Sequence, residues 1–403
     1  MRSTMMVKVI SVNAGSSSLK FQLFEMPSEK TLCSGIVERI GFSDAISTIK
    51  FNGNKVSVVL PIKDHKVAVE LVLKSLIDNK IVLSLDELTE VGHRFVHGGE
   101  AYAASIELND DVEKTVESLI DLAPLHNPAN LIGFRAFKKE LPNARHVAVF
   151  DTAFHQTMKP EIYLYPIPYE YYTNYKIRRY GFHGTSHYYV SHRVAELMHK
   201  DPKDINVITC HLGNGASIAA VEGGISVNTS MGFTPLAGIM MGTRSGDIDP
   251  AMIPFLMNKL SLKAEEVVDI LNKKSGMLGV SGISSDARDI EKRVNEGDSR
   301  ALLTLNLYAN RIAQTIGSYF VQLGHVDAIV FTGGVGENDA NVRAAVAKRV
   351  SEALHIDFDY DLNSKSRSSE VLLSKESSHT QIWIVPTNEE LVIARDTVRI
   401  LGM

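Results

Sequence analysis

The chain has 403 residues, of which 44% are hydrophobic and 22% charged, a composition typical of a globular protein with room for roughly two or three domains. A net charge of −5 and a sequence pI near 6.3 argue against a nucleic-acid-binding surface and favour small-molecule chemistry. The two cysteines, Cys33 and Cys210, cannot build a disulfide framework or a cysteine-based metal site, which fits a reducing cytoplasm.

The amino-terminal segment predicts a β-hairpin around a turn of glycine and small polar residues. Residues 7–13 (VKVISVN) and 20–26 (KFQLFEM) have strand character, with AGSSSL between them. Backbone N–H groups of such a turn form a site for a phosphate or ribose. The competing interpretation is a tight hairpin in which glycine only serves the backbone geometry. No run approaches the ~20 apolar residues that span a bilayer, and no signal segment is seen, so we expect a cytoplasmic protein without a membrane partner.

Helices and strands alternate through the middle of the chain. A helix is predicted over 67–78, a strand over 146–151, a helix over 187–200, and strands over 205–212 and 216–222. This alternation predicts an α/β protein with mixed sheets. Prolines at 160, 166 and 168 lie among aromatic residues, where we expect a domain boundary and no regular element.

The second half repeats the order of strand, small-residue turn and strand. Residues 207–224 match residues 9–25 in this respect, so we expect a duplicated domain with a cleft between the copies. A long helix is predicted to end at Gly324, followed by a strand and the turn GGVGEN (333–338), whose glycines permit positive φ and close approach of a nucleotide. The last segment predicts a strand and then a helix capped by Thr387 or Asn388.

Arginines and histidines beside glycines are the chemical candidates, as in GHRFVHGGE (92–100), RRYGFHGTSH (178–187) and MMGTRSGDIDP (240–250). Phosphoryl transfer needs cations around the equatorial oxygens more than it needs a strong base, and Arg94, His183 and Arg244 have that chemistry. The competing interpretation of each arginine is an ordinary ion pair. His183 and His187 have a spacing that could hold a metal, but without an HExxH glutamate or a cysteine partner zinc is disfavoured.

Asp151 ends a predicted strand, where ligands bind in α/β sheets, although it could instead cap the segment that follows. Other polar residues leave two interpretations open: Asn13 fits a plain turn, and Glu389 fits a helix N-terminus. His97, His126 and His155 fit buried core positions as well as ligand positions. The chain has no GxxxxGK[ST], no helix-opening GxGxxG and no GxSxG, which excludes the P-loop, dinucleotide and hydrolase-elbow arrangements.

Together these motifs resemble the acetate kinase (acetokinase) family, within the superfamily of sugar kinases, heat-shock chaperones and actin. The resemblance runs nearly end to end and rests on NAGSSSLKF (13–21), GHRFVHGG (92–99), PLHNPAN (124–130), FDTAFHQTM (150–158), RRYGFHGTSH (178–187), HLGNGAS (211–217), MGFTPLAGIMMGTRSGDIDP (231–250), FTGGVGEN (331–338) and PTNEE (386–390).

The resemblance implies an α/β fold of duplicated ribonuclease-H-like (actin-like ATPase) domains, with mixed sheets flanking a nucleotide cleft. Residues 1–150 with 385–403 would form the amino-terminal acetokinase domain, and residues 151–384 the nucleotide-binding domain. The implied protein is a cytoplasmic homodimer that transfers the ATP γ-phosphoryl group reversibly and in line to acetate, giving acetyl phosphate and ADP. Mg²⁺ would be the divalent ion, with Mn²⁺ as an alternative.

The resemblance also assigns roles to residues. The implied catalytic residues are Arg94, Asp151, His183 and Arg244, with Arg94 also binding substrate. The implied acetate pocket is formed by Val96, Leu125, His126, Phe182 and Pro235. The implied nucleotide residues are His211, Leu212, Gly213, Asn214, Gly215, Asp286, Ala287, Arg288, Gly334, Val335, Gly336, Glu337 and Asn338. The implied metal-associated residues are Asn13 and Glu389.

The chemistry of the substrate refines these roles. Acetate is already ionised near neutral pH, so Asp151 is not expected to be a general base; we expect it to orient a cation or the metal's water shell. Val96 favours acetate, with propionate as a slower substrate, because a smaller residue there tends to accompany propionate use in the family. Ala287 departs from the aromatic residue often found in the family, which predicts relaxed selectivity for the base. A different class, a nucleotide-gated binding protein of the same fold, would not need the Arg94, His183, Arg244 and Asp151 cluster.

Overall fold

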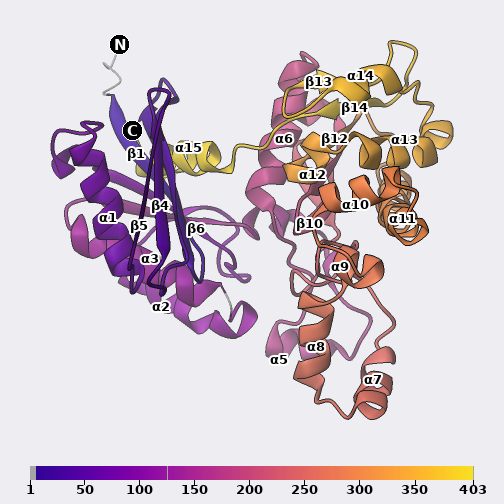
Figure 1. The fold of residues 1–403 in the computed structure, drawn as a ribbon, viewed down its shortest axis with the longest axis horizontal. Helices are drawn as coiled ribbons and strands as arrows, with labels where there is room; N and C mark the ends of the chain where they lie inside the picture. Colours follow the sequence, from indigo (N-terminus) through magenta and orange to yellow (C-terminus); the bar gives the residue numbers. More distant parts are fainter. Residues whose placement is uncertain (1–5, 125, 403) are drawn as a thin grey trace. The chain divides into compact units, whose positions relative to one another are not determined.

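The computed structural model describes residues 6–124 and 126–402. The chain divides into two compact units, one formed by Met1–Phe154 with Asn388–Met403 and the other by His155–Thr387 (Figure 1). The expected boundaries were 150/151 and 384/385. No helix in the described ranges is both long and apolar enough to cross a bilayer.

The first unit is built on a sheet of eight strands in the order β5-β4-β3-β2-β1-β6-β8-β7. Its strands are β1 (Val7–Ala14), β2 (Ser18–Met26), β3 (Lys30–Glu38), β4 (Ala45–Phe51), β5 (Asn54–Leu60), β6 (Glu90–Phe95), β7 (Ile106–Glu107) and β8 (Arg145–Phe150). Its helices are α1 (His65–Asp78), η1 (Leu85–Glu87), α2 (Asp110–Ser118), η2 (Ile120–Leu122), α3 (Asn127–Glu140) and α15 (Glu389–Leu401).

The second unit is built on a sheet of six strands in the order β11-β10-β9-β12-β14-β13. Its strands are β9 (Asn206–Leu212), β10 (Ala216–Glu222), β11 (Ile225–Thr229), β12 (Ala328–Thr332), β13 (Val371–Leu372) and β14 (Gln381–Ile384). Its helices are α4 (Pro160–Tyr163), α5 (Tyr169–Tyr175), α6 (Gly184–Leu197), η4 (Pro202–Asp204), α7 (Met252–Leu260), α8 (Ala264–Lys273), α9 (Gly276–Ser281), α10 (Ala287–Asn295), α11 (Ser299–Leu323), α12 (Gly333–Asn338), α13 (Ala340–Leu354) and α14 (Tyr360–Lys365). The short helix η3 (Ala153–Thr157) spans the point where the first unit passes into the second.

The two sheets share one topology. In the first, β2 pairs antiparallel with β1 and β3, and β1, β6 and β8 run parallel. In the second, β10 pairs antiparallel with β9 and β11, and β9, β12 and β14 run parallel. The expected α/β class, with duplicated ribonuclease-H-like domains and mixed sheets, is confirmed by this repeat.

Side chains of the first sheet alternate between two buried faces, as the period of two in a strand requires. On β8, Val147 and Val149 pack with Ile393 of α15, whereas Phe150 belongs to a cluster with Phe134 of α3. Gly92 of β6 allows α15 to lie close, because a Cβ there would come within 2.5 Å of Ile393. Helices on both faces therefore hold β6 and β8 in place.

Two expectations about local structure need correction. Pro160 begins α4 and Pro168 directly precedes α5, so these prolines start helices and do not exclude them; proline's fixed φ suits a first helical turn. In the turn 333–338, only Gly333 has positive φ, at 77°. The remaining residues of the turn form the short helix α12.

Candidate active site

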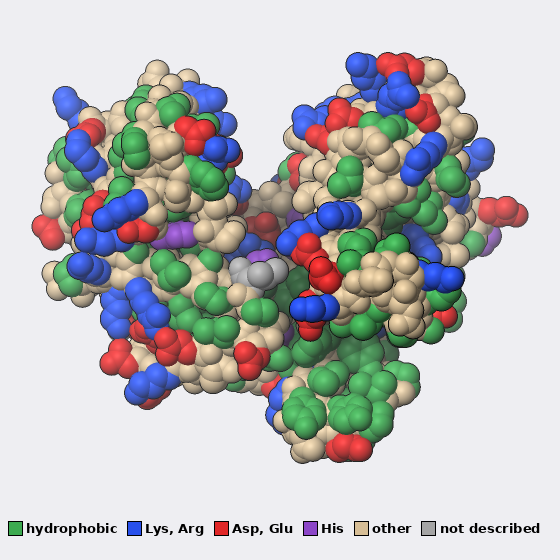
Figure 2. Space-filling model, turned by 60° about the horizontal axis from the view of Figure 1, so that its bottom comes forward, with side chains coloured by type: hydrophobic (Ala, Val, Ile, Leu, Met, Phe, Trp, Pro, Cys, Tyr) green, Lys and Arg blue, Asp and Glu red, His purple; other side chains and the backbone are tan. Residues whose placement is uncertain are grey.

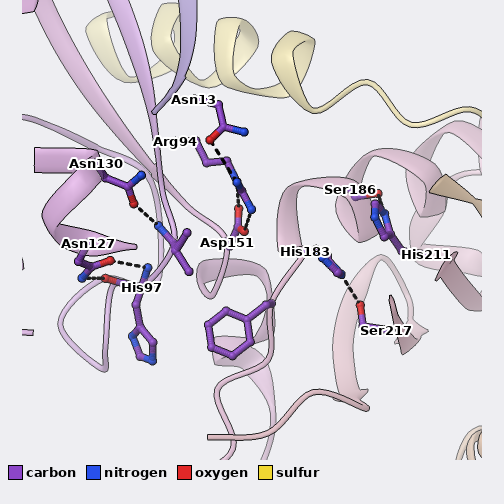
Figure 3. Close-up of polar contacts among 12 residues, drawn as sticks. Asn13, Arg94, His97, Asn127, Asn130, Asp151, His183, Ser186, His211 and Ser217 are labelled. Atoms are coloured by element: carbon purple, nitrogen blue, oxygen red, sulfur yellow. Dashed lines mark hydrogen bonds and ion pairs between the residues drawn. The ribbon is translucent and has the colours of Figure 1, made fainter. Parts of the chain in front are cut away.

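Three side chains of the first unit meet at the carboxyl ends of its parallel strands (Figure 3). Arg94 of β6 donates from Nε to Asp151 Oδ1 at 3.0 Å and from Nη2 to Asp151 Oδ2, and its Nη1 donates to Asn13 Oδ1 at 3.2 Å. Asn13 lies in β1, and Asp151 directly follows β8. Carboxyl ends of parallel strands are where ligands bind in such sheets.

The Arg94–Asp151 contact is a two-point pair between a planar guanidinium and a planar carboxylate, the geometry that fixes an arginine most firmly. Asp151 is 1% exposed, and the Arg94 side chain is 22% exposed. Burial lowers the pKa of Arg94, but the charges of Asp151, Glu389 and Glu390 outweigh that effect and raise it above its ordinary value. Arg94 is therefore a fixed, permanently charged group with one carboxylate already bound.

Glu389 lies in the first turn of α15, whose N-cap is Asn388: Asn388 Oδ1 accepts a hydrogen bond from Leu391 N at 3.2 Å. This confirms the second of the two expected caps. The neighbouring Glu390 pairs with Lys20. The backbone carbonyl of Glu390 also accepts a hydrogen bond from Ser11 of β1, which ties the start of α15 to the sheet.

Within the described ranges, no three His, Cys, Asp or Glu side chains are grouped to hold a metal ion. Mg²⁺ does not require such a cage, because it keeps several waters and binds one or two carboxylates together with substrate phosphates. Asn13 and Glu389, both in the first unit with Asp151, offer the oxygen ligands that Mg²⁺ prefers. The donor set present therefore fits a water-rich magnesium ion.

Of the expected acetate-pocket residues, the first unit holds Val96, Leu125 and His126. Val96 is 4% exposed, and its N–H donates to Asn130 Oδ1 at 3.1 Å. Asn130 Nδ2 in turn donates to the carbonyl of Ala14 at 2.7 Å, which links the segment after β6 to the end of β1. His126 is exposed and is the residue before α3. Leu125 lies outside the described residues.

His183 stands at the start of α6 in the second unit with φ of 56°, a left-handed conformation that is uncommon for a histidine. Its Nδ1 lies 2.8 Å from Ser217 Oγ of β10 (Figure 3). Its ring stacks on that of His211 with centroids 4.2 Å apart, and His211 Nδ1 lies 2.7 Å from Ser186 Oγ. Strained backbone of this kind is often kept where a side chain must point at a ligand.

Arg244 lies in the same unit and points toward the turn between β9 and β10. A Cβ added to Gly215 in that turn would lie 3.4 Å from Arg244 Nη1 and 3.6 Å from His183 Nε2. Arg244 Nη1 donates to the carbonyl of Pro235 at 3.1 Å. No carboxylate in the described part of the chain pairs with Arg244, and burial lowers the pKa of its guanidinium.

Phe182 and Pro235, the remaining acetate-pocket candidates, flank these cations in sequence and space. Phe182 is 2% exposed and directly precedes His183, and its carbonyl lies 2.9 Å from His155 Nε2. Pro235 is half-buried and supplies the carbonyl that fixes Arg244. Both apolar side chains thus belong to the segments that carry the two cationic candidates of this unit.

A cavity of about 700 Å³ opens in the second unit, within the usual size range of small-ligand sites. It is lined by Gly213, Asn214, Ser285, Asp286, Ala287, Arg288, Glu291, Gly334, Val335, Asn338, Asp339 and Arg367. Three glycine-bearing or polar segments predicted to meet a nucleotide therefore converge here. Asp286 caps α10 and pairs with the exposed Arg288.

Five predicted nucleotide residues do not line this cavity. Leu212 is fully buried in the core, and His211 and Gly215 lie beside His183. Gly336 is packed so that a Cβ would come within 3.4 Å of Phe331. Glu337 turns back, and its Oε1 accepts from Gly333 N at 3.0 Å and from Thr387 N at 3.3 Å. Gly336 and Glu337 therefore shape the turn.

Four residues of the cavity wall were not predicted from the sequence: Ser285, Glu291, Asp339 and Arg367. A fully buried arginine, Arg343, was missed as well; it donates from Nη1 to the carbonyl of Gly336 at 2.9 Å and from Nη2 to that of Ser366 at 2.9 Å. Ser285, Glu291 and Asp339 lie within five residues of a predicted nucleotide residue, but no spacing rule marks Arg367 or Arg343.

Of the histidines with two open interpretations, His97, His155 and His187 are core residues, whereas His126 is exposed. His187 and His155 are fully buried and bonded to hydroxyls, His187 Nδ1 to Thr209 Oγ1 at 2.7 Å and His155 Nδ1 to Ser226 Oγ at 2.7 Å. His97 is likewise fully buried, and its N–H donates to Asn127 Oδ1 (Figure 3). The spacing of His183 and His187 therefore serves hydrogen bonding to hydroxyl groups.

Comparison with known proteins adds independent evidence. The family model described as the acetokinase family matches residues 8–395. An acetate kinase from Geobacillus sp. (strain WCH70) is 56% identical over 398 residues, covering 99% of this chain and 100% of the relative. The crystal structure of Porphyromonas gingivalis acetate kinase has a TM-score of 0.94 at 46% identity, covering 98% of this chain and all of that one. A propionate kinase from Francisella tularensis has a TM-score of 0.92 at 40% identity, with the same coverage.

Proposed function

The chain belongs to the acetokinase family, and from this membership we propose that it is an acetate kinase, which transfers the γ-phosphoryl group of ATP reversibly to acetate and forms acetyl phosphate and ADP. The observation that carries the proposal is the full-length similarity to acetate kinases, together with the fixed Arg94–Asp151 pair and an Arg244 that pairs with no carboxylate among the residues the structure describes. A nucleotide-gated binding protein needs positive charge for the phosphates of its nucleotide, but it does not require the full set of Arg94, His183, Arg244 and Asp151.

The chemical problem of this reaction is repulsion, because ionised acetate must approach a polyanionic phosphate. We propose direct in-line transfer, with Arg94 and Arg244 neutralising charge on the acetate carboxylate and on the transferring phosphoryl group. Arginine suits this task because its charge persists and its planar donors match three-oxygen and two-oxygen anions. Catalysis then consists of positioning and electrostatic stabilisation.

Asp151 has a supporting role in this proposal. Both of its oxygens are bound by Arg94, so it orients a cation and does not take a proton from acetate. His183 is proposed to stabilise the transferring phosphoryl group through Nε2, the ring nitrogen nearest to the β9–β10 turn. His126 is proposed to lie beside the substrate with Val96, Leu125, Phe182 and Pro235.

The family uses a nucleotide and a divalent metal ion, and we propose Mg²⁺, with Mn²⁺ as an alternative. Asn13 and Glu389 would hold it through its water shell. When bound, the ion supplies positive charge to the phosphate oxygens. The protein fixes the positions of these two residues. Asn13 is held by its hydrogen bond from Arg94, and Glu389 by its place in the capped first turn of α15.

We propose that the 700 Å³ cavity of the second unit takes the nucleoside part of ATP or ADP. Gly334 has open space on the side where a Cβ would stand, so the backbone of α12 is accessible to a ligand. Ala287 offers no ring for stacking on a base, which supports relaxed selectivity among purine nucleotides. Residues 151–384 are accordingly proposed as the nucleotide-binding domain and residues 1–150 with 385–403 as the acetokinase domain.

We further propose a cytoplasmic homodimer that binds neither nucleic acid nor membrane. Helix α7 exposes three large apolar side chains, Met252 at 45%, Phe255 at 60% and Leu260 at 54%. Figure 2 shows hydrophobic side chains gathered on the lobe at its lower right, and exposed apolar clusters of this kind usually mark an interface. A second copy of the chain is the proposed partner.

The activity is tested by trapping acyl phosphate with hydroxylamine after incubation with ATP, Mg²⁺ and acetate. Hydroxamate formation that depends on all three components is expected. A purified, folded protein that binds ATP but forms no acyl phosphate from acetate would refute the proposed activity and leave a nucleotide-gated binding protein as the better description.

A further inference from the structure

Behind His183, a chain of side-chain hydrogen bonds leads into the core of the second unit. Ser217 Oγ lies 2.8 Å from His183 Nδ1 and 2.8 Å from His187 Nε2, and His187 Nδ1 lies 2.7 Å from Thr209 Oγ1. Thr209, His187 and Ser217 are each 0% exposed. They come from β9, α6 and β10, so three separate elements fix the geometry.

We propose that Thr209, His187 and Ser217 act as positioning residues that hold His183 as the neutral tautomer with its hydrogen on Nε2. This inference deepens the proposed function, on which it rests for the identity of the group that the Nε2 hydrogen meets. The nearest described landmarks of Nε2 are Gly215 of the β9–β10 turn and Arg244.

The direction of the chain follows from counting hydrogens. A hydroxyl has one hydrogen to donate and can accept up to two hydrogen bonds. Among the residues that the structure describes, Ser217 Oγ is bonded only to His183 and His187, so its hydrogen goes to one imidazole and the other imidazole donates to it. In one direction Thr209 donates to His187 Nδ1, His187 Nε2 donates to Ser217, and Ser217 donates to His183 Nδ1. The hydrogen of His183 is then on Nε2, and every hydrogen within the chain has an acceptor.

The reverse direction leaves a hydrogen without an acceptor. His183 Nδ1 would donate to Ser217, Ser217 to His187 Nε2, and His187 Nδ1 to Thr209, whose own hydrogen would then need another acceptor. Among the residues that the structure describes, Thr209 Oγ1 has no hydrogen-bond partner except His187. Because a buried hydroxyl without an acceptor is unfavourable, the first direction is preferred.

The charges around this hydrogen-bond chain agree with the first direction, in which Thr209 donates to His187. Burial, assisted by His155 and His211, keeps the pKa of His187 well below its ordinary value, so His187 is neutral and carries one ring hydrogen. A doubly protonated His183 would need a hydrogen on Nδ1, which requires the reverse direction. The Arg244 guanidinium beside Nε2 opposes a second positive charge as well. The positive charge at this site therefore comes from the arginines, and His183 acts as a neutral hydrogen-bond donor.

The tautomer matters for the proposed reaction. With the hydrogen on Nε2, His183 offers an N–H to an anionic oxygen, and a preorganised donor of that kind stabilises charge that develops in a transition state. With the hydrogen on Nδ1, Nε2 would carry a lone pair, and this lone pair would face the anion and repel it.

The direct test is the tautomer of His183, read from ¹⁵N chemical shifts of the ring in full-length, ligand-free protein labelled at histidine, at pH 7. A His183→Gln spectrum assigns the signal among the 14 histidines. We expect the Nε2–H tautomer in the wild type and in Thr209→Ser, which keeps the hydroxyl. Ser217→Ala and Thr209→Val are expected to show a mixture of tautomers.

Kinetics supply the second readout. Ser217→Ala and Thr209→Val are expected to lower kcat by about 10- to 100-fold, by analogy with the loss of groups that orient metal-binding histidines, with KM for ATP and acetate little changed. The matched control is Ser226→Ala, which removes a hydroxyl from another buried histidine, His155, and is expected to keep near-normal kcat.

Three results would overturn the proposal: a wild-type His183 with its hydrogen on Nδ1, a doubly protonated His183 at pH 7, or an unchanged tautomer in both Ser217→Ala and Thr209→Val. None of these depends on turnover. If the wild type formed no acetyl phosphate but showed the expected tautomer, the proposed activity would fail and the assignment of the hydrogen-bond chain would stand.

Discussion

Arg94 and Arg244 carry the same side chain in different electrostatic settings. Arg94 is bound at two points by the buried Asp151, whereas burial lowers the pKa of Arg244, which pairs with no carboxylate among residues 6–124 and 126–402. A bound carboxylate fixes the orientation of a guanidinium but offsets its positive charge. A guanidinium without a carboxylate partner keeps its full attraction for an anion. The two arginines are thus suited to different parts of one task.

The first prediction concerns Asp151. Asp151→Asn keeps the size of the side chain but removes the charge that aims Arg94, and we expect kcat to fall on the order of 10²-fold, the cost of a small misplacement at a reacting centre. Because Asp151 acts through Arg94, the same substitution in an Arg94→Ala background should cost little more than Arg94→Ala alone. Additive losses in this double-mutant cycle would show that Asp151 acts independently of Arg94.

The second prediction concerns Val96, which is 4% exposed and held by Asn130. Val96→Ala removes two methyl groups, and one methylene in an apolar pocket is worth roughly 10- to 200-fold in discrimination. We expect the ratio of kcat/KM for propionate over acetate to rise by about 10-fold or more. The wild type should favour acetate; a wild-type enzyme that prefers propionate would contradict the role given to Val96.

At the scale of elements, a buried histidine pair adds a side-chain contact to the backbone pairing of β6 with β8. His93 Nε2 lies 2.9 Å from His146 Nδ1, and both rings pack edge-on against Phe134. Burial lowers the pKa of His146 to about 4, and burial, with His146 adding to the effect, also holds the pKa of His93 well below its ordinary value. Both rings are therefore neutral in the folded protein at neutral pH.

The third prediction is a loss of local stability in mild acid. Above pH 6.5 both states are neutral and stability is complete; between pH 6.5 and 4 only the unfolded chain takes up protons, so stability falls as pH falls, by on the order of 3 kcal/mol for His146 alone. Amide exchange of β6 and β8, compared at pH 7 and pH 5, should show this loss. It should shrink in His146→Phe and persist in the control His325→Gln, an exposed histidine; equal losses in all three proteins would rule out the pair as the cause.

The sequence predicted elements well where local patterns decide them. Hairpins around Gly15 and around Gly213–Gly215, the end of α11 at Gly324 and the cap at Asn388 all follow from turn and cap chemistry. The prolines of α4 and α5 were misjudged because proline also starts helices. The wall of the 700 Å³ cavity, the proposed nucleotide site, was predicted in part: Gly334 and Asp286 lie in recognisable motifs, whereas Arg367 reaches the cavity only through folding of the segment after α14.

At the scale of the whole molecule, the duplicated sheet explains why the candidate groups recur at strand ends. Asn13 and Arg94 lie near the carboxyl ends of β1 and β6, and Asp151 directly follows β8; these three strands are neighbours in one sheet, so the meeting of the three side chains was foreseeable from the topology. The hydrogen-bond chain behind His183 was not, since Thr209 and Ser217 are ordinary strand residues in the sequence. Contacts between elements distant in sequence require the structure.

The fourth prediction concerns the exposed face of α7. Phe255→Asp places a charge on a side chain that is 60% exposed and should convert the proposed dimer to a single chain of 44.4 kDa in size-exclusion chromatography with light scattering. The control is Leu83→Asp, which changes an exposed apolar residue of the first unit. A Phe255→Asp protein with unchanged mass would exclude this face as the dimer interface.

The central claim is that positive side chains make an anion an acceptor for a phosphoryl group, and it is tested most directly by the rate of acetyl phosphate formation in Arg244→Ala. We predict a loss of roughly 10³-fold or more, by analogy with arginines that stabilise phosphoryl transfer. The control Arg349→Ala changes an exposed arginine bonded to Asn306 and should retain normal turnover. A folded Arg244→Ala enzyme that forms acetyl phosphate at a rate near that of the wild type would contradict the claim.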